Sequence, residues 1–170
     1  FIDRLVADSR DVALNHTAGL STPQQIQMML FASFAPFDTQ NAYKKVSVDL
    51  LRHRYKLLWD GMQWPVIPDP ERASYYCEID IAAWAEKSHG KEFLAWLEKN
   101  FEPVDVVFRL AERCSVVLLN GGGFAGPQWS VRVSLANLNE EDYTRLGTIL
   151  RHTLDEYVES WNEQTAKQAD

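Results

Sequence analysis

One arginine in the last third of the chain stands where it could bind an acid. Arg132 lies between Val131 and Val133, whose apolar side chains take one face of an alternating stretch and leave Arg132 on the other. Ser130 and Ser134 share the face of Arg132. A guanidinium can donate two parallel hydrogen bonds to one carboxylate, so an arginine fixed on a strand suits a carboxylic-acid ligand. The pattern alone, however, favours an ordinary solvated arginine.

A glycine-rich segment precedes that strand and could bring backbone close to a ligand. Gly121-Gly122-Gly123-Phe124-Ala125-Gly126 matches the G-x-G-x-x-G spacing of dinucleotide-binding loops. Such loops need a helix directly behind them, because its N-terminus holds the pyrophosphate. Pro127 and an alternating strand follow instead, which disfavours a nucleotide-dependent oxidoreductase. We interpret the segment as a turn in which glycine permits positive φ or a close backbone approach, including approach to a small ligand.

Other polar groups give weaker signals. Tyr76, Glu78 and Asp80 share the polar face of another alternating stretch, and paired carboxylates could do acid–base chemistry, although a solvated face is the commoner outcome. Cys77 and Cys114 have no C-x-x-C spacing and are interpreted as buried, reduced thiols of a cytosolic protein. The histidines show no helical pair, so we expect no metal site: they are His16, His53, His89 and His152.

Two periodicities show which elements must position these residues. Alternation predicts strands near residues 73–81 and 129–136, and a short apolar run at 116–119 predicts another buried strand. Helical spacing predicts helices over residues 82–101, over 104–113 and from about 139 onward. The second half thus reads β-α-α-β-β-α, which predicts an α+β fold with helices over one face of a small sheet.

The first half is predicted to be helical. Thr22 as N-cap, Pro23 as the first helical residue and Gln25 three positions after the cap predict a helix start, and Pro36 predicts its end. A second long helix is expected from about residue 39 to residue 61.

Composition bounds the function classes. With 170 residues, 46% of them hydrophobic, the chain suits one globular domain. Its formal net charge of −7 argues against nucleic-acid and anionic-membrane partners, and no apolar stretch is long enough to cross a bilayer. The chain begins at Phe1 without Met, so we expect a longer parent polypeptide.

The stretch Val117–Phe124 followed by Val131–Ala136 resembles the C-terminal end of fold type I, pyridoxal-phosphate-dependent aminotransferases. In those proteins a strand and a glycine-containing loop ending in Phe precede a strand of the form Arg-x-Ser-x-Ala. Residues 15–25 and 132–138 narrow the resemblance to the bacterial bifunctional aspartate aminotransferase/aspartate 4-decarboxylase group. It covers nearly the whole chain.

The resemblance implies roles for particular residues. Arg132 would bind the substrate α-carboxylate, and the cleft would be lined by Asn120, Gly121, Gly122, Gly123 and Phe124. Asn120 stands where many aminotransferases have Pro. The segment with Thr17, Ser21 and Thr22 would approach the cofactor and the dimer interface. No lysine has the setting of the family's Schiff-base lysine, so we expect no catalytic residue and no bound cofactor in this chain; its lysines are Lys44, Lys45, Lys56, Lys87, Lys91, Lys99 and Lys167.

The resemblance also implies an organisation and a function. Residues 1–38 would be a helical lead-in from the large cofactor-binding domain, and residues 39–170 the small C-terminal domain, with a mainly antiparallel sheet of three to four strands. The chain would be the C-terminal part of a cytoplasmic, homo-oligomeric enzyme that uses pyridoxal 5'-phosphate on aspartate and a 2-oxo acid, with both transamination and decarboxylation left open. The alternative is a standalone, non-catalytic α+β module that binds a partner or a small acid.

Overall fold

The computed structural model describes residues 21–66 and 69–169. Its elements, in chain order, are α2 (Thr22–Phe34), η1 (Ala35–Phe37), α3 (Ala42–Met62), β1 (Tyr76–Asp80), α4 (Ile81–His89), α5 (Lys91–Asn100), α6 (Asp105–Cys114), β2 (Leu119–Asn120), η2 (Gly121–Phe124), β3 (Ser130–Ser134) and α7 (Glu140–Ala169). The chain divides into two compact units, Phe1–Val46 and Ser47–Asp170, which are treated separately. The predicted domain boundary after residue 38 stays a prediction.

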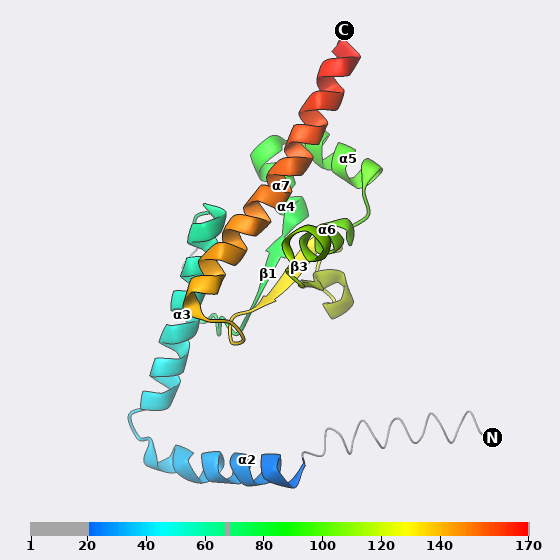
Figure 1. Cartoon of the computed structure of the whole chain (residues 1–170). Coiled ribbons are helices and arrows are strands. Elements are labelled where there is room, and N and C mark those ends of the chain that lie inside the picture. The colour runs from blue at the N-terminus through cyan, green and yellow to red at the C-terminus, as the bar shows by residue number, and fades with distance from the viewer. Residues whose placement is uncertain (1–20, 67–68, 170) are drawn as a thin grey trace, which may run out of the picture. The chain divides into compact units, whose positions relative to one another are not determined.

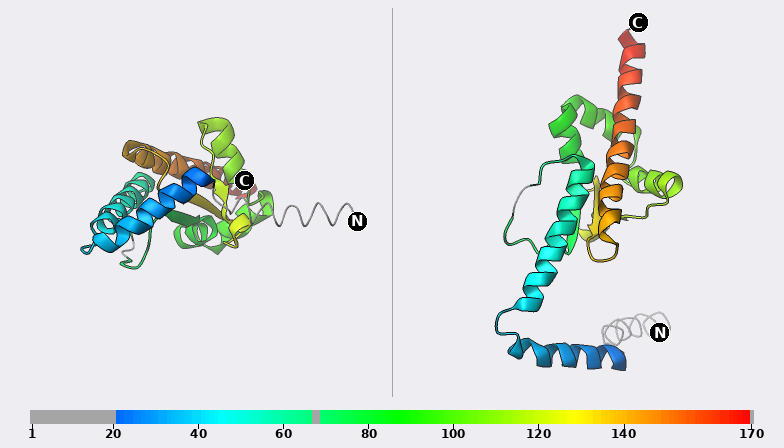
Figure 2. Two further views of the ribbon diagram at one scale, coloured as in Figure 1. Left: turned by 90° about the horizontal axis from the view of Figure 1, so that it is seen from below. Right: turned by 60° about the vertical axis from the view of Figure 1, so that its left-hand side comes forward.

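The second unit contains a three-stranded antiparallel sheet in the order β1-β3-β2 (Figure 1). In the register of the sheet, Arg132 on the central strand lies opposite Glu78 of β1 and Leu119 of β2. Helices α4 to α7 and most of α3 belong to the same unit as the sheet (Figure 2). The predicted α+β fold with a small antiparallel sheet is confirmed.

One face of the sheet belongs to the hydrophobic core. Cys77 and Ile79 of β1 and Val131 and Val133 of β3 are all buried, in one cluster with side chains from the helices. Alternation along both strands therefore places the remaining strand residues, Arg132 included, on the opposite face. Burial raises the pKa of the Cys77 thiol to about 12, so this cysteine stays protonated at neutral pH and is no nucleophile.

The strands are shorter than predicted, for local reasons. Ser74 has a left-handed backbone (φ 56°), so β1 begins only at Tyr76. Asp80 ends the strand because its carboxylate accepts a hydrogen bond from the Ala83 N–H at 2.8 Å and caps α4. The run at 116–119 was predicted to be a buried strand, which is wrong: only Leu119 and Asn120 pair, at the sheet edge, and Val117 is 80% exposed.

Three further expectations need correction. The helix predicted over residues 82–101 is two helices, because Gly90 at φ 89° breaks it. The N-cap of α2 is Ser21 and not Thr22, since the Ser21 N–H donates to Oε1 of Gln24 at 2.9 Å in a capping box. Cys114 is only partly buried, whereas Cys77 is buried as expected.

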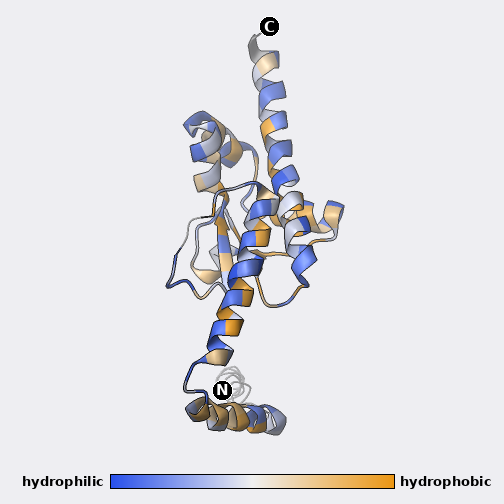
Figure 3. Cartoon of the chain, turned by 90° about the vertical axis from the view of Figure 1, so that its left-hand side faces the viewer, coloured by the Kyte–Doolittle hydropathy of each residue, from blue (hydrophilic) through white to orange (hydrophobic). Residues whose placement is uncertain are grey.

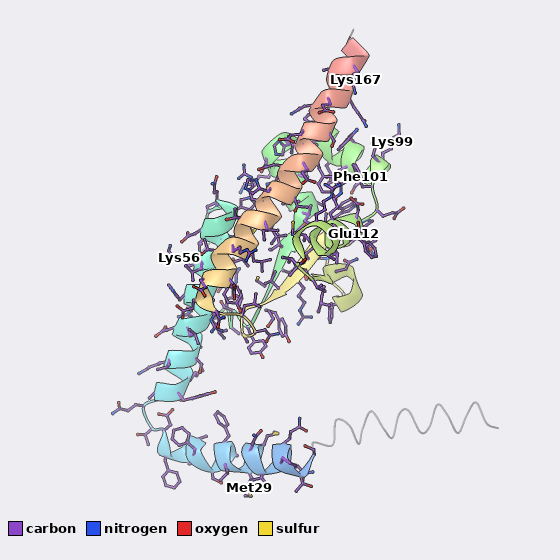
Figure 4. The ribbon with its side chains drawn as sticks, in the orientation of Figure 1. Met29, Lys56, Lys99, Phe101, Glu112 and Lys167 are labelled. Atoms are coloured by element: carbon purple, nitrogen blue, oxygen red, sulfur yellow. The ribbon has the colours of Figure 1, made fainter. Side chains whose placement is uncertain are left out.

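Helix α2 exposes an apolar surface. Its thirteen residues include no charged side chain, and none is buried. Apolar residues run along it (Figure 3), and Met29 marks the helix among the drawn side chains (Figure 4). A helix that is apolar on several sides is usually covered by other protein. This exposure supports the domain proposal, in which the first residues belong with a larger part of a parent protein.

We expect the exposed and buried leucines to respond differently to the same truncation. Leu30→Ala on α2, where the side chain is 61% exposed, should change the free energy of unfolding by less than about 0.5 kcal/mol. Leu58→Ala on α3, where the side chain is 0% exposed, should cost about 2–5 kcal/mol because it leaves a cavity. Urea unfolding followed by circular dichroism measures both values. Equal losses would contradict the surface position of α2.

Candidate functional site

Arg132 is the centre of the site. Its backbone is in the middle of the sheet, and its side chain is partly buried on the face away from the core. The guanidinium carbon lies 4.0 Å from the ring centroid of Tyr76 and 4.4 Å from that of Phe124. Within residues 21–66 and 69–169, the guanidinium has no hydrogen-bond or ion-pair partner. No described residue therefore occupies its N–H groups.

A second arginine of the same unit shows what a purely structural arginine looks like. Arg109 also lies near two rings, 5.0 Å from Phe101 and 4.3 Å from Tyr157. Its Nε, however, donates to a carboxylate oxygen of Asp105 at 2.7 Å, and Glu156 is 3.6 Å from its Nη1. Burial and the hydrogen bond to Asp105 raise the pKa of Tyr157. Arg109 thus forms ion pairs with acids of the fold, whereas Arg132 forms none with the described residues.

The glycine-rich turn brings Phe124 to Arg132. The Asn120 side chain accepts a hydrogen bond from the Gly122 N–H at 3.0 Å, and the Gly126 N–H donates to the Gly121 carbonyl at 3.1 Å. The turn is a short 3-10 helix (η2) with Phe124 at its end, and no helix begins at Gly126, as the prediction against a dinucleotide-binding loop required.

Gly121 permits a close approach between this turn and β3. A Cβ on Gly121 would lie 1.9 Å from Oγ of Ser130. Ser130 is buried there, although it is on the polar side of the strand, and its hydroxyl donates to the Pro127 carbonyl at 2.8 Å. The turn is therefore fastened to the strand that carries Arg132.

We expect Gly121→Ala to destabilise the protein by about 1–3 kcal/mol, the usual cost of overpacking. Gly123→Ala is the matched control, because a Cβ there meets nothing within 4 Å, and its effect should stay within about 0.5 kcal/mol. Thermal unfolding of both variants measures the difference. A Gly121→Ala variant as stable as Gly123→Ala would show that the turn can move away from Ser130.

A cavity of about 280 Å³ opens beside Arg132. It is lined in part by Tyr76, Leu119, Arg132, Ser134, Asn137 and Leu138. Glu78 lies on the same sheet face and opposite Arg132, yet the two form no ion pair. The Glu78 carboxylate lies instead against Gly126, where a Cβ would be 2.4 Å from its Oε2. The arrangement is an arginine without an ion pair to any described residue, beside an opening of small-molecule size.

The structure brings several predicted site residues together. Phe124 contacts Arg132, the side chain of Asn120 shapes the turn, and Gly121 meets the strand. Ser21 and Thr22 stand at the start of α2 in the other unit, while Thr17 lies outside the described residues.

Sequence reasoning missed Tyr76 as a neighbour of Arg132. It placed Tyr76 on the polar face, with Glu78 and Asp80, but gave it no contact. The signal lies in the pairing: Glu78 is opposite Arg132, so Tyr76, two residues earlier, is the diagonal neighbour on the same face.

The described part of the chain has neither a metal-binding cluster nor a membrane-crossing helix. No group of three or more His, Cys, Asp or Glu side chains gathers there in a way that could hold a metal ion. Among the described helices, none combines the length and the apolar character needed to cross a membrane.

Comparison with known proteins supplies the family context. No family model matches the chain. A curated protein of Pseudomonas sp, a bifunctional aspartate aminotransferase and L-aspartate beta-decarboxylase, is 45% identical over 161 residues, which are 95% of this chain. The matched region is 30% of that relative, so this chain spans less than a third of its length. The resemblance predicted from the motifs is therefore confirmed: almost the whole chain is similar to a part of a bifunctional aspartate aminotransferase and aspartate beta-decarboxylase.

Proposed function

We propose that this chain is the C-terminal part of a pyridoxal-phosphate-dependent enzyme that transaminates or β-decarboxylates aspartate. In this proposal Arg132 binds the α-carboxylate of the substrate. The similarity to the Pseudomonas protein supports the reaction, and the partners are the remainder of the same enzyme and further copies of it. We also propose a cytoplasmic location, because the two cysteines were interpreted as reduced thiols.

The observation that carries the proposal is the state of Arg132. A guanidinium in a partly buried position, with no ion pair to an acid among the described residues, can receive a carboxylate. The neighbouring cavity gives room for a small acid. A two-point contact would fix both the position and the rotation of the carboxylate, and so orient the bonds at the adjacent carbon.

The residues of this chain do not themselves fit a pyridoxal-phosphate site. The cofactor requires a lysine for its Schiff base, whereas all seven lysines are exposed helix residues and none lines the cavity beside Arg132. We therefore assign the cofactor and the catalytic lysine to the remainder of the enzyme. This chain contributes substrate binding and, alone, no catalysis.

The test is an assay of the complete reading frame that contains this chain. With pyridoxal phosphate and aspartate, we expect alanine and CO2 from β-decarboxylation, or glutamate when 2-oxoglutarate is supplied. The 170-residue chain alone should form no reducible Schiff base under the same conditions. Absence of every product from the complete protein would contradict the proposal.

The rival proposal is a standalone module that binds a small acid or a protein without catalysis. The hydrophobic core of the second unit is formed by its own helices and sheet, which favours a part that can fold alone. An intact-mass measurement on the natively expressed protein separates the two proposals. A native product of 170 residues would favour the module.

A further inference from the structure

Among the described residues, Arg132 contacts two aromatic rings and has no hydrogen-bond partner. Tyr76 from β1 and Phe124 from the end of η2 place their ring centroids 4.0 and 4.4 Å from its guanidinium carbon. The two rings come from segments almost fifty residues apart in the sequence, and both lie against this one side chain.

Rings can hold an arginine without occupying its donors. A cation over an aromatic face is attracted by the ring quadrupole, whereas a carboxylate partner would occupy N–H groups that a ligand needs. The contrast with Arg109, which is 18% exposed and bound to Asp105, shows both solutions in one molecule. Contact with the rings leaves the N–H groups of Arg132 without an acceptor among the described residues.

The rings also keep Arg132 from pairing with a nearby acid, Glu78. Glu78 is directly opposite Arg132, at a distance where cross-strand side chains of opposite charge commonly pair. Its carboxylate lies against Gly126 instead, and the guanidinium is kept by Tyr76 and Phe124. If the rings did not hold it, Arg132 could form an ion pair with Glu78, and its N–H groups would then no longer be available to bind a ligand.

We propose that Tyr76 and Phe124 are positioning residues that hold Arg132 unpaired and ready to bind a carboxylate. The inference rests on the proposed function in one respect, that the carboxylate is that of aspartate. The turn enters through Phe124, since the hydrogen bond from the Gly122 N–H to the Asn120 side chain shapes η2. Neither ring touches the reacting atoms; both act through Arg132.

The kinetic test uses the complete holoenzyme. Tyr76→Leu and Phe124→Leu remove one ring each and should raise KM for aspartate about fivefold, with a smaller change in kcat. Tyr76→Phe keeps the ring and should return KM close to that of the unmodified enzyme. Phe108→Leu removes a ring of similar exposure, 59% against 50% for Phe124, from α6 and should leave KM unchanged.

A double variant separates positioning from general damage. In an Arg132→Ala background, the same ring replacements should change KM by less than about twofold, because interacting residues are not additive. If Arg132→Ala raises KM and the ring variants do not, the positioning role is overturned and the proposed function stands. If Arg132→Ala leaves KM unchanged, both are overturned.

A spectroscopic test needs no activity. In the 170-residue chain, the Nε–Hε resonance of Arg132, assigned by its loss in Arg132→Lys, should move in Tyr76→Leu and in Phe124→Leu, because each replacement removes a ring current. It should move much less in Tyr76→Phe. A resonance that stays in place in both leucine variants would overturn the inference.

Discussion

Replacing Arg132 with alanine in the complete enzyme is expected to raise KM for aspartate about 100-fold and to lower kcat/KM at least as much. Hydrogen bonds to charged groups contribute about 1.5–3 kcal/mol each. A 100-fold change corresponds to about 2.7 kcal/mol, so it is a conservative value for the loss of two such bonds. The reason is structural: Arg132 lines the cavity and forms no ion pair with any of the described residues. Steady-state kinetics with aspartate measure the change.

The controls follow from the same geometry. Arg132→Lys keeps the charge but loses the planar pair of donors, so we expect only partial recovery of KM. Arg113→Ala removes an exposed arginine, 58% exposed, whose partner is Glu156, and should leave KM within about twofold. The free energy of unfolding of Arg132→Ala should change little, because no buried acid loses its partner. Unchanged aspartate kinetics in Arg132→Ala would rule out the assignment.

The sequence predicted what depends on simple periodicity. Val131 and Val133 alternate with Arg132, and successive residues of a strand point to opposite faces. Burial of the two valines therefore places Arg132 on the other face, as the pattern predicted. The stripe of α7 was equally readable, because Leu146, Leu150 and Leu154 recur at helical spacing and are buried. Each pattern repeats over several residues of a single strand or helix, so it can be recognised without knowing how distant segments pack.

What the sequence did not predict depends on contacts between distant segments. The contact between Tyr76 and Arg132 depends on the register of β1 and β3, and the sequence pattern of one strand does not specify that register. Val117 is exposed and precedes the two paired residues of β2, and an apolar run does not specify which of its residues will join a sheet. Gly90 was read as an ordinary helix residue, although its positive φ divides α4 from α5.

Two glycines that the sequence analysis did not single out are expected to be among the most sensitive positions of the fold. Gly61 of α3 and Gly147 of α7 are buried where these helices cross. A Cβ on Gly147 would lie 2.2 Å from the Leu58 carbonyl oxygen, and one on Gly61 would lie 2.2 Å from the Thr144 carbonyl oxygen. Both obstacles are backbone of the opposite helix, which cannot rotate away as a side chain can.

Gly147→Ala should therefore destabilise the second unit by about 3 kcal/mol, the upper end of ordinary overpacking. The sign of the change in unfolding free energy is informative, because Gly→Ala in an exposed helix interior stabilises a protein by about 1 kcal/mol. Urea unfolding followed at 222 nm measures it. Gly61→Ala should cost a similar amount, and the double variant less than the sum, because the first added methyl group already separates the helices and makes room for the second. A stabilised Gly147→Ala protein, or strict additivity of the pair, would show that α3 and α7 do not meet backbone to backbone.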